Sequence, residues 1–323
     1  MNANTSIIFG PVPSRRLGRS LGINNIPPKI CSYSCIYCQL GPTINMAIDR
    51  QDFYPPEEIL RAVREKLEET AKAGEKVDYL TFVPDGEPTL DINLERAIDL
   101  LKPLGIPIAV ITNTSLLRRQ EVGKALMQAD WVSLKIDSVE EKIWRKIDRP
   151  HRLLELASIL DGALEFAGLF QGKLVSETML VADVNDTDQS LGKTAEFLAL
   201  LQPETAYLSI PIRPPAEKWA QAPDEHVINR AYQIFQKKIK NVEYLTGYEG
   251  NTFAFTGNVE EDILSITAVH PMRNDAVTDF LQRAGAKWDI IEQMVARGRL
   301  IETEYGNNRF YLRRFHKAPG HKP

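Results

Sequence analysis

The feature that most constrains this fold is a regular alternation of short apolar runs with longer amphipathic segments. Strands are predicted at residues 20–25, 77–83, 106–112, 131–136, 174–181, 206–212 and 242–245. Helices are predicted between them at 56–74, 91–102, 119–128, 140–167, 188–201 and 225–240. Strands that alternate with helices of this length form parallel βαβ units with right-handed crossovers. The sequence therefore predicts an α/β fold with a partial or complete TIM-type (βα) barrel over residues 1–258.

The C-terminal part has a different pattern. Helices are expected at 260–269, from Pro271 through Leu281, and at 288–297, with breaks at Gly285 and Gly298. Residues 300–304 and 309–312 then alternate like strands around a turn at 306–308. Three helices followed by a hairpin predict a small winged helix-turn-helix-like domain at 259–323. Its end is a basic tail with Arg309, Arg313, Arg314, Lys317 and Lys322.

Composition narrows the class of protein. The 323 residues carry a net charge of −4, which does not suggest that the whole chain binds nucleic acid. No apolar run reaches the 18 residues that a membrane span needs. The first residues lack a basic segment followed by a long apolar core, so no signal peptide and a cytoplasmic location are expected.

All three cysteines of the chain, Cys31, Cys35 and Cys38, lie within eight residues. Thiols grouped this closely indicate metal or cluster ligation rather than a disulfide framework. A [4Fe–4S] cluster normally takes four ligands, so three cysteines leave one iron open for chemistry. The alternatives are unrelated buried thiols or a zinc site. Zinc would need a fourth ligand, and the nearest histidine is His151.

The cysteine loop resembles the signature of the radical S-adenosylmethionine (SAM) superfamily, in which an aromatic residue precedes the third cysteine, as Tyr37 does here. The resemblance implies that Cys31, Cys35 and Cys38 hold one [4Fe–4S] cluster whose open iron binds SAM. It further implies that reduction cleaves SAM to methionine and a 5′-deoxyadenosyl radical, which abstracts a hydrogen from a substrate. An external electron donor, such as a flavodoxin or ferredoxin, is then expected as a partner.

Further segments resemble elements that contact SAM in that superfamily. Residues 84–89 are similar to its Gly-Gly-Glu motif, with Gly86 and Glu87 in place and Asp85 where many members have glycine. Asn113, at the end of a predicted strand, and Ser133, on the next one, are expected to contact SAM. Lys135 and Asp137 share the side of Ser133 by the two-residue period of a strand. Such residues also favour strand ends without any ligand.

Residues 10–24 resemble the opening of a branch of Fe–S oxidoreductases similar to the wybutosine synthases, which modify tRNA. Those enzymes carry additional cysteines for a second cluster, and this chain has none. Besides Lys135 and Asp137, the candidate substrate-binding residues lie near strand ends: Arg15, Arg16, Glu177 and Arg213. An alternative for Arg213 is a surface ion pair with Glu217.

The leading hypothesis is a radical SAM enzyme that acts on an unknown substrate, with RNA modification as one candidate activity. The competing hypothesis is an Fe–S redox sensor whose winged helix reads DNA. The segments around Glu87 and Asn113, which resemble SAM-contacting motifs, favour the enzyme hypothesis because a sensor needs no SAM pocket.

Overall fold

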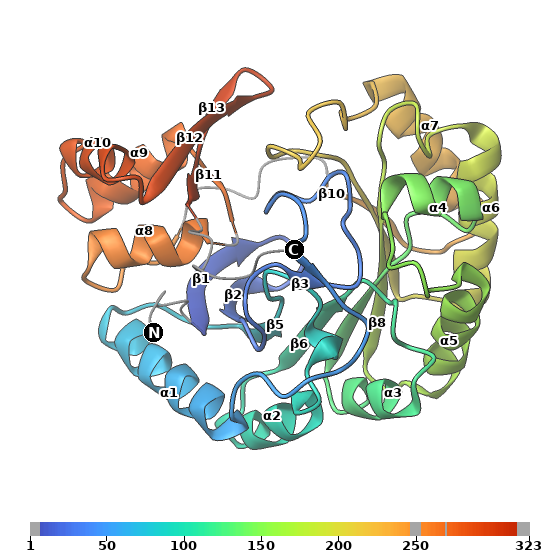
Figure 1. Ribbon diagram of the computed structural model, residues 1–323, viewed down its shortest axis with the longest axis horizontal. Helices are drawn as coiled ribbons and strands as arrows, with labels where there is room; N and C mark the ends of the chain where they lie inside the picture. The colour runs from blue at the N-terminus through green and yellow to red at the C-terminus, as the bar shows by residue number, and fades with distance from the viewer. Residues whose placement is uncertain (1–6, 246–252, 269, 315–323) are drawn as a thin grey trace.

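The chain folds around one curled sheet that is open on one side, with helices on its outer face (Figure 1). The structure is a computed structural model that describes residues 7–245, 253–268 and 270–314. The strand order within the sheet is β1-β2-β5-β6-β7-β8-β9-β10. All neighbours from β2 to β10 pair in parallel, whereas β1 is antiparallel to β2. The predicted α/β fold with a partial barrel is confirmed.

The strands of this sheet are short, as expected for a barrel wall. Their bounds are β1 Ile8–Ser14, β2 Gly18–Ile23, β5 Tyr79–Phe82, β6 Ile108–Thr112, β7 Trp131–Lys135, β8 Lys173–Met179, β9 Thr205–Ser209 and β10 Val242–Leu245. A separate two-stranded pairing joins β3, Ile30–Cys31, to β4, Asn45–Met46, and closes the loop that contains the cysteines.

The crossover helices lie in the predicted segments, although α2 begins at Leu94 instead of residue 91 and α7 ends at Gln236 instead of residue 240. Helix α1 has Pro56 at its start, and Thr187 and Asp224 cap α6 and α7 by accepting from backbone N–H groups. No helix of the described ranges is long and apolar enough to cross a bilayer. The helix bounds are α1 Pro56–Lys72, α2 Leu94–Leu101, α3 Gln120–Leu126, α4 Glu141–Ile147, α5 Leu156–Leu169, α6 Asp188–Leu201 and α7 Glu225–Gln236, with 3-10 turns at Pro88–Leu90 and Lys102–Leu104.

Strand β1 is the strand of the large sheet that the sequence did not predict. It contains Pro11 and Pro13, which argue against an internal strand because proline cannot donate to the ladder. At the edge of the sheet that restriction is relaxed, and the pairing with β2 tolerates an irregularity between Phe9 and Val12. The cysteine loop therefore follows the second strand of the sheet, not the first.

Alternate residues of the strands serve two separate cores. On β6 and β7, Val110 and Val132 face outward and pack in the large core beneath the helices. Their neighbours Ala109 and Trp131 point into the barrel, where they pack with Val175, Tyr207 and other residues. This division follows from the two-residue period of a strand.

The C-terminal elements have a core of their own. They are α8 Val259–Thr267, β11 Met272–Arg273, α9 Asn274–Arg283, α10 Asp289–Ala296, β12 Leu300–Tyr305 and β13 Asn308–Arg313. The strands form an antiparallel sheet in the order β11-β13-β12. Helix α9 begins at Asn274 instead of near Pro271, because Met272 and Arg273 pair with β13. The last part of the predicted basic tail, residues 315–323, lies outside the described residues.

These C-terminal elements lie against the barrel at two places. Ala268 packs with Phe9 of β1, and Lys66 of α1 forms an ion pair with Asp262 of α8 at 3.6 Å. Farther along, the Tyr305 hydroxyl of β12 donates to the carbonyl oxygen of Pro211 at 3.0 Å. The second contact matters for function because Pro211 follows β9 at the mouth of the barrel.

We predict that Gly22→Ala destabilises the protein by about 1–3 kcal/mol, because a Cβ there would lie 2.0 Å from the ring of buried Phe9. Urea unfolding measures the loss. Gly123→Ala in α3 is the control: nothing lies within 4 Å of the added Cβ, so no loss is expected. Equal stability of the Gly22 variant and the wild type would contradict this account of the β1–β2 contact.

Candidate active site

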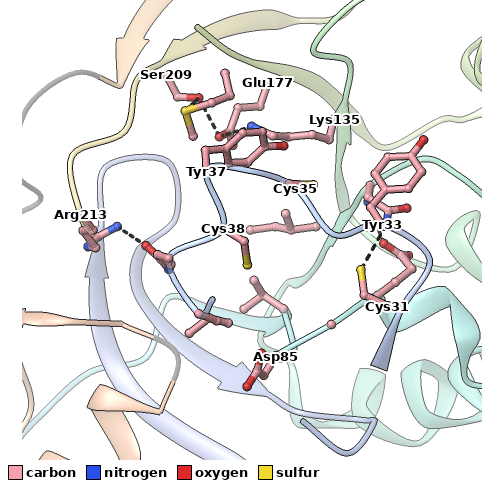
Figure 2. Close-up of a pocket in the computed structure, with 18 of the residues that line it drawn as sticks. Cys31, Tyr33, Cys35, Tyr37, Cys38, Asp85, Lys135, Glu177, Ser209 and Arg213 are labelled. Carbon is pink, nitrogen blue, oxygen red and sulfur yellow. Dashed lines mark hydrogen bonds and ion pairs between the residues drawn. The ribbon is translucent and has the colours of Figure 1, made fainter. Parts of the chain in front are cut away.

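A cavity of about 330 Å³ opens at the carboxyl ends of the barrel strands (Figure 2). It is bounded by the cysteine loop, by the loop after β5 and by the ends of β6 to β9. In parallel α/β barrels this end carries the chemistry. The predicted site residues that line it are Arg15, Arg16, Cys31, Cys35, Tyr37, Cys38, Gly86, Glu87, Asn113, Lys135, Glu177 and Arg213.

The cysteine loop is pinned by backbone hydrogen bonds to the end of α4. The N–H of Ser34 donates to the Asp148 carbonyl at 3.0 Å, and that of Ile36 to Ile147 at 2.9 Å. A tight turn brings the N–H of Cys38 to 3.1 Å from the Cys35 carbonyl. All three thiols thereby face one cavity without help from a disulfide.

The three cysteines are half-buried, and the charge on one thiol affects the pKa of another. Burial raises the pKa of Cys31 to about 12, and it also raises the pKa of Cys35 and Cys38. Charge on the neighbouring thiols adds to the increase for Cys31 and Cys35. The ammonium of Lys29 acts in the opposite sense on the pKa of Cys38. Three thiolates here need a bound positive group, and a metal centre that takes thiolate ligands supplies it.

The donor set fits a cluster better than a single metal ion. Within the described parts of the chain, no three His, Cys, Asp or Glu side chains are arranged to hold one ion. A tetrahedral zinc site requires such convergence, whereas a [4Fe–4S] cluster takes each thiolate on a different iron. Figure 2 shows the three cysteines among the side chains that line the cavity.

Glu87 is the organising residue of the strand ends beside this loop. Its Oε1 accepts from the Thr89 N–H and hydroxyl, at 3.1 and 2.6 Å, and from the Thr112 hydroxyl at 2.6 Å. Its Oε2 accepts from the Asn113 N–H at 2.7 Å. Burial raises the pKa of Glu87, although all these bonds favour the carboxylate. The carboxylate therefore orders the loops after β5 and β6.

Asn113 connects this network to the sulfur atoms. Its Nδ2 donates to the Ser32 hydroxyl at 2.8 Å and lies 3.5 Å from the sulfur of Cys31. The side chain thus lies between the β6 end and the cysteine loop, in the position expected from the sequence.

Gly86 is required by a close approach of two backbones. A Cβ at this position would lie 1.9 Å from the Ile30 carbonyl oxygen. The same oxygen accepts from the Glu87 N–H at 3.2 Å. Beside it, the carbonyl of Asp85 accepts from the Lys29 N–H at 2.6 Å, and their side chains pair at 3.6 Å. The loop after β5 therefore holds the cysteine loop in place through direct backbone hydrogen bonds.

The Tyr37 hydroxyl contacts two buried carboxyl groups, Asp137 and Asp148, and Asp148 was not identified from the sequence. The hydroxyl donates to Asp137 and lies 3.3 Å from Asp148, which is 3.4 Å from the sulfur of Cys35. Burial and the charge of Asp137 hold the pKa of Asp148 well above its usual range. Asp148 ends helix α4 with no motif around it, so no sequence signal could have found it.

Two predicted residues do not line the cavity. Ser133 is 1% exposed and lies on β7 between Trp131 and Lys135, which face the barrel interior. Asp137 is 2% exposed, and it accepts from the Tyr37 hydroxyl and from the Met179 N–H. The structure places Asp137 as a support for Tyr37.

Another part of the cavity wall is charged. Lys135 lies 3.0 Å from Glu177, whose other oxygen contacts Arg16, and the Ser209 hydroxyl donates to Glu177 at 3.0 Å. Burial favours the neutral form of Glu177, yet Lys135 and Arg16 hold its pKa far below the usual range. Ser209 is a further residue that sequence reasoning missed.

Arg213 lies at the mouth of the cavity and contacts two parts of the chain. It donates to Gln39, just after Cys38, and its other nitrogen lies 3.0 Å from His270, beside the C-terminal elements. Glu217 pairs with Arg149 instead. The alternative of an Arg213–Glu217 surface pair is therefore wrong.

Comparison with known proteins agrees with this site. Residues 25–198 match the family model described as the radical SAM superfamily, and the chain belongs to that superfamily, whose members are enzymes that bind a [4Fe–4S] cluster and SAM. A UPF0026 protein of Methanocaldococcus jannaschii is 50% identical over 310 residues, which are 95% of this chain and 96% of that protein.

Solved structures share the fold at low sequence identity. The structure of TYW1 with a bound lysine-pyruvate adduct has a TM-score of 0.54 and 16% identity, and the match covers 74% of this chain and 78% of that one. SuiB of Streptococcus suis bound to SAM has a TM-score of 0.52 and 13% identity, with 69% and 49% covered. TYW1 is a wybutosine synthase, so the expected likeness in scaffold is confirmed.

We predict that Glu87→Gln destabilises the protein by about 1–3 kcal/mol, because the new NH₂ group faces a donor where the carboxylate accepted. Urea unfolding of the metal-free protein measures this loss. Glu121→Gln, in the first turn of α3, should cost far less. Comparable losses in the two variants would show that the Glu87 network does not hold the strand ends.

Glu177→Gln should be destabilising by about 3 kcal/mol near neutral pH, because it leaves Arg16 without its carboxylate and removes one of the two carboxylates that pair with Lys135. The native pKa of Glu177 is depressed, so its stabilisation is present above the unfolded value of about 4.3 and is lost as pH falls toward the native value. Urea unfolding at a series of pH values should show the difference from the wild type shrinking below about pH 4. A difference that does not change with pH would contradict this.

Proposed function

We propose that this chain is a radical SAM enzyme with a single [4Fe–4S] cluster held by Cys31, Cys35 and Cys38. The observation that carries the proposal is that these thiols, the only three in the chain, line one cavity beside the ordered ends of β5 and β6. When bound and reduced, the cluster supplies the electron that cleaves SAM to methionine and a 5′-deoxyadenosyl radical, which abstracts a substrate hydrogen.

The residues around the cysteines suit this task. Asn113 donates toward the sulfur of Cys31, and the ammonium of Lys29 favours the thiolate of Cys38. Hydrogen bonds and charges at cluster sulfurs set the reduction potential. Gly86, Glu87 and Asn113 form the edge where SAM is proposed to bind, with Tyr37 beside it. Ser133 stays a predicted SAM contact, although it does not line the cavity.

We further propose that residues 259–323 form a winged-helix-type docking module for a substrate or partner. The order helix–strand–helix–helix–strand–strand supports this interpretation. Its contact with Pro211 places it beside the mouth of the cavity. Nucleic acid is one candidate substrate class, to which Arg309 and Arg313 of β13 would contribute positive charge. A flavodoxin or ferredoxin is the proposed electron donor, and the location is proposed to be cytoplasmic.

Anaerobic reconstitution with iron and sulfide, followed by dithionite and SAM, tests the enzymatic function. The wild type should produce 5′-deoxyadenosine, and Cys38→Ser should lose the product together with the iron and the charge-transfer absorbance of the cluster. Asn45→Ala is the matched control, because this exposed residue lies on the same loop and should change neither reading.

Three outcomes would contradict the proposal. If the wild type binds a cluster but produces no 5′-deoxyadenosine, the Fe–S sensor gains support. Zinc without iron or sulfide would indicate a structural metal site. Product formation by Cys38→Ser at the wild-type rate would remove that residue from the cluster.

A further inference from the structure

One wall of the cavity carries a charged cluster that the chemistry at the cysteines does not use. Arg16 comes from the turn between β1 and β2, Lys135 from the end of β7, Glu177 from β8 and Ser209 from the end of β9. These four residues are called the polar wall below. Figure 2 shows Lys135, Glu177 and Ser209 together on one side of the cavity that the cysteines also line.

The guanidinium of Arg16 is held in a fixed orientation. Its Nη1 contacts Glu177, and its central carbon lies 5.9 Å from the ring centroids of both Trp131 and Tyr207. Both aromatic residues are buried inside the barrel. Packing between rings and an ion pair leave the side chain little freedom, as a preorganised binding group requires.

One edge of this guanidinium lacks an acceptor. Nε of Arg16 is buried, yet it has no hydrogen-bond partner in the described part of the protein. A buried donor without a partner is costly and rare, and at a cavity it indicates a place for a ligand oxygen. Guanidinium edges pair with carboxylates and phosphates through two parallel hydrogen bonds.

The charge around Arg16 selects an anion. At the polar wall Arg16 and Lys135 share the carboxylate of Glu177, and Lys135 also pairs at 3.5 Å with Asp137, which does not line the cavity. Lys135 remains an ammonium, because Asp137 and Glu177 raise its pKa despite its burial. Among the side chains of the polar wall that line the cavity, two cations therefore share one carboxylate, which favours a negatively charged ligand.

We propose that the polar wall binds an oxyanion of the substrate, a carboxylate or a phosphate, with Arg16 as its main contact and Lys135 as the second positive charge. Glu177 is then a positioning residue that aligns the two cations. This inference rests on the proposed function, since it takes the bound molecule to be the hydrogen donor.

The test uses the reconstituted protein with acetate and inorganic phosphate as probes and acetamide as the neutral control. At constant ionic strength, an anion that binds the native state raises the melting temperature in proportion to the logarithm of its concentration once it is near saturation. At least one anion should do so, and acetamide should not. The anion that stabilises more at equal concentration identifies the carboxylate or the phosphate as the preferred group, and either result supports the proposal.

Variants of Arg16 and of the nearby Arg19 test whether the anion binds at the polar wall. Arg16→Gln should weaken anion binding by about tenfold or more, and Arg16→Lys by less, because lysine keeps the charge but lacks the planar fork. Arg19→Gln is the matched control: Arg19 lies in the same hairpin, but its side chain pairs with Glu75 outside the cavity. Its anion binding should equal that of the wild type.

The proposal would be overturned if the anions raised the melting temperature of Arg16→Gln as much as that of the wild type. It would also be overturned if neither anion raised the melting temperature of the wild type. If Arg16→Gln does not fold, Arg16→Lys provides the comparison, and an unchanged affinity there would overturn the bidentate contact. Formation of 5′-deoxyadenosine is measured on the same preparation without anions. Its absence counts against the proposed function alone, whereas loss of anion binding counts against the polar wall alone.

Discussion

The site depends on the contact between the loop after β5 and the cysteine loop. The Ile30 carbonyl lies so close to Gly86 that a side chain there is excluded, and it accepts from the Glu87 N–H. The Glu87 carboxylate then gathers the donors of Thr89, Thr112 and Asn113. One buried carboxylate therefore fixes two strand ends and, through them, the segment that carries the cysteines. A buried network in which every partner is satisfied gives such rigidity.

The rest of the cavity is built by elements that come from distant parts of the chain. The hairpin of β1 and β2 inserts Arg16 toward Glu177 of β8, while β7 supplies Lys135. The end of α4 pins the cysteine loop and brings Asp148 to Tyr37 and Cys35. The cavity is consequently lined both by the three thiols and by a group of fixed charges.

The C-terminal elements are connected to this cavity by a few polar contacts. Tyr305 holds the carbonyl of Pro211, and Arg213 joins Gln39 of the cysteine loop to His270. Burial and the neighbouring Arg213 keep the pKa of His270 low, so the imidazole faces the guanidinium in its neutral form. A molecule that docks on the C-terminal elements would therefore lie beside residues that line the mouth of the cavity.

The sequence by itself determined the alternation of strands and helices, the triad of cysteines and the motif after β5, because each is a local pattern with a local physical cause. It also placed Lys135, Glu177 and Arg213 at strand ends, where parallel strands bring residues together. It failed at β1, since proline argues against a strand and only the edge position tolerates it. Tertiary structure alone decided that Asp148 approaches Cys35, that Asp137 supports Tyr37, and that an arginine of the first hairpin meets a carboxylate 161 residues away. Those contacts join segments distant in sequence, and the tertiary fold around the curled sheet brings them together.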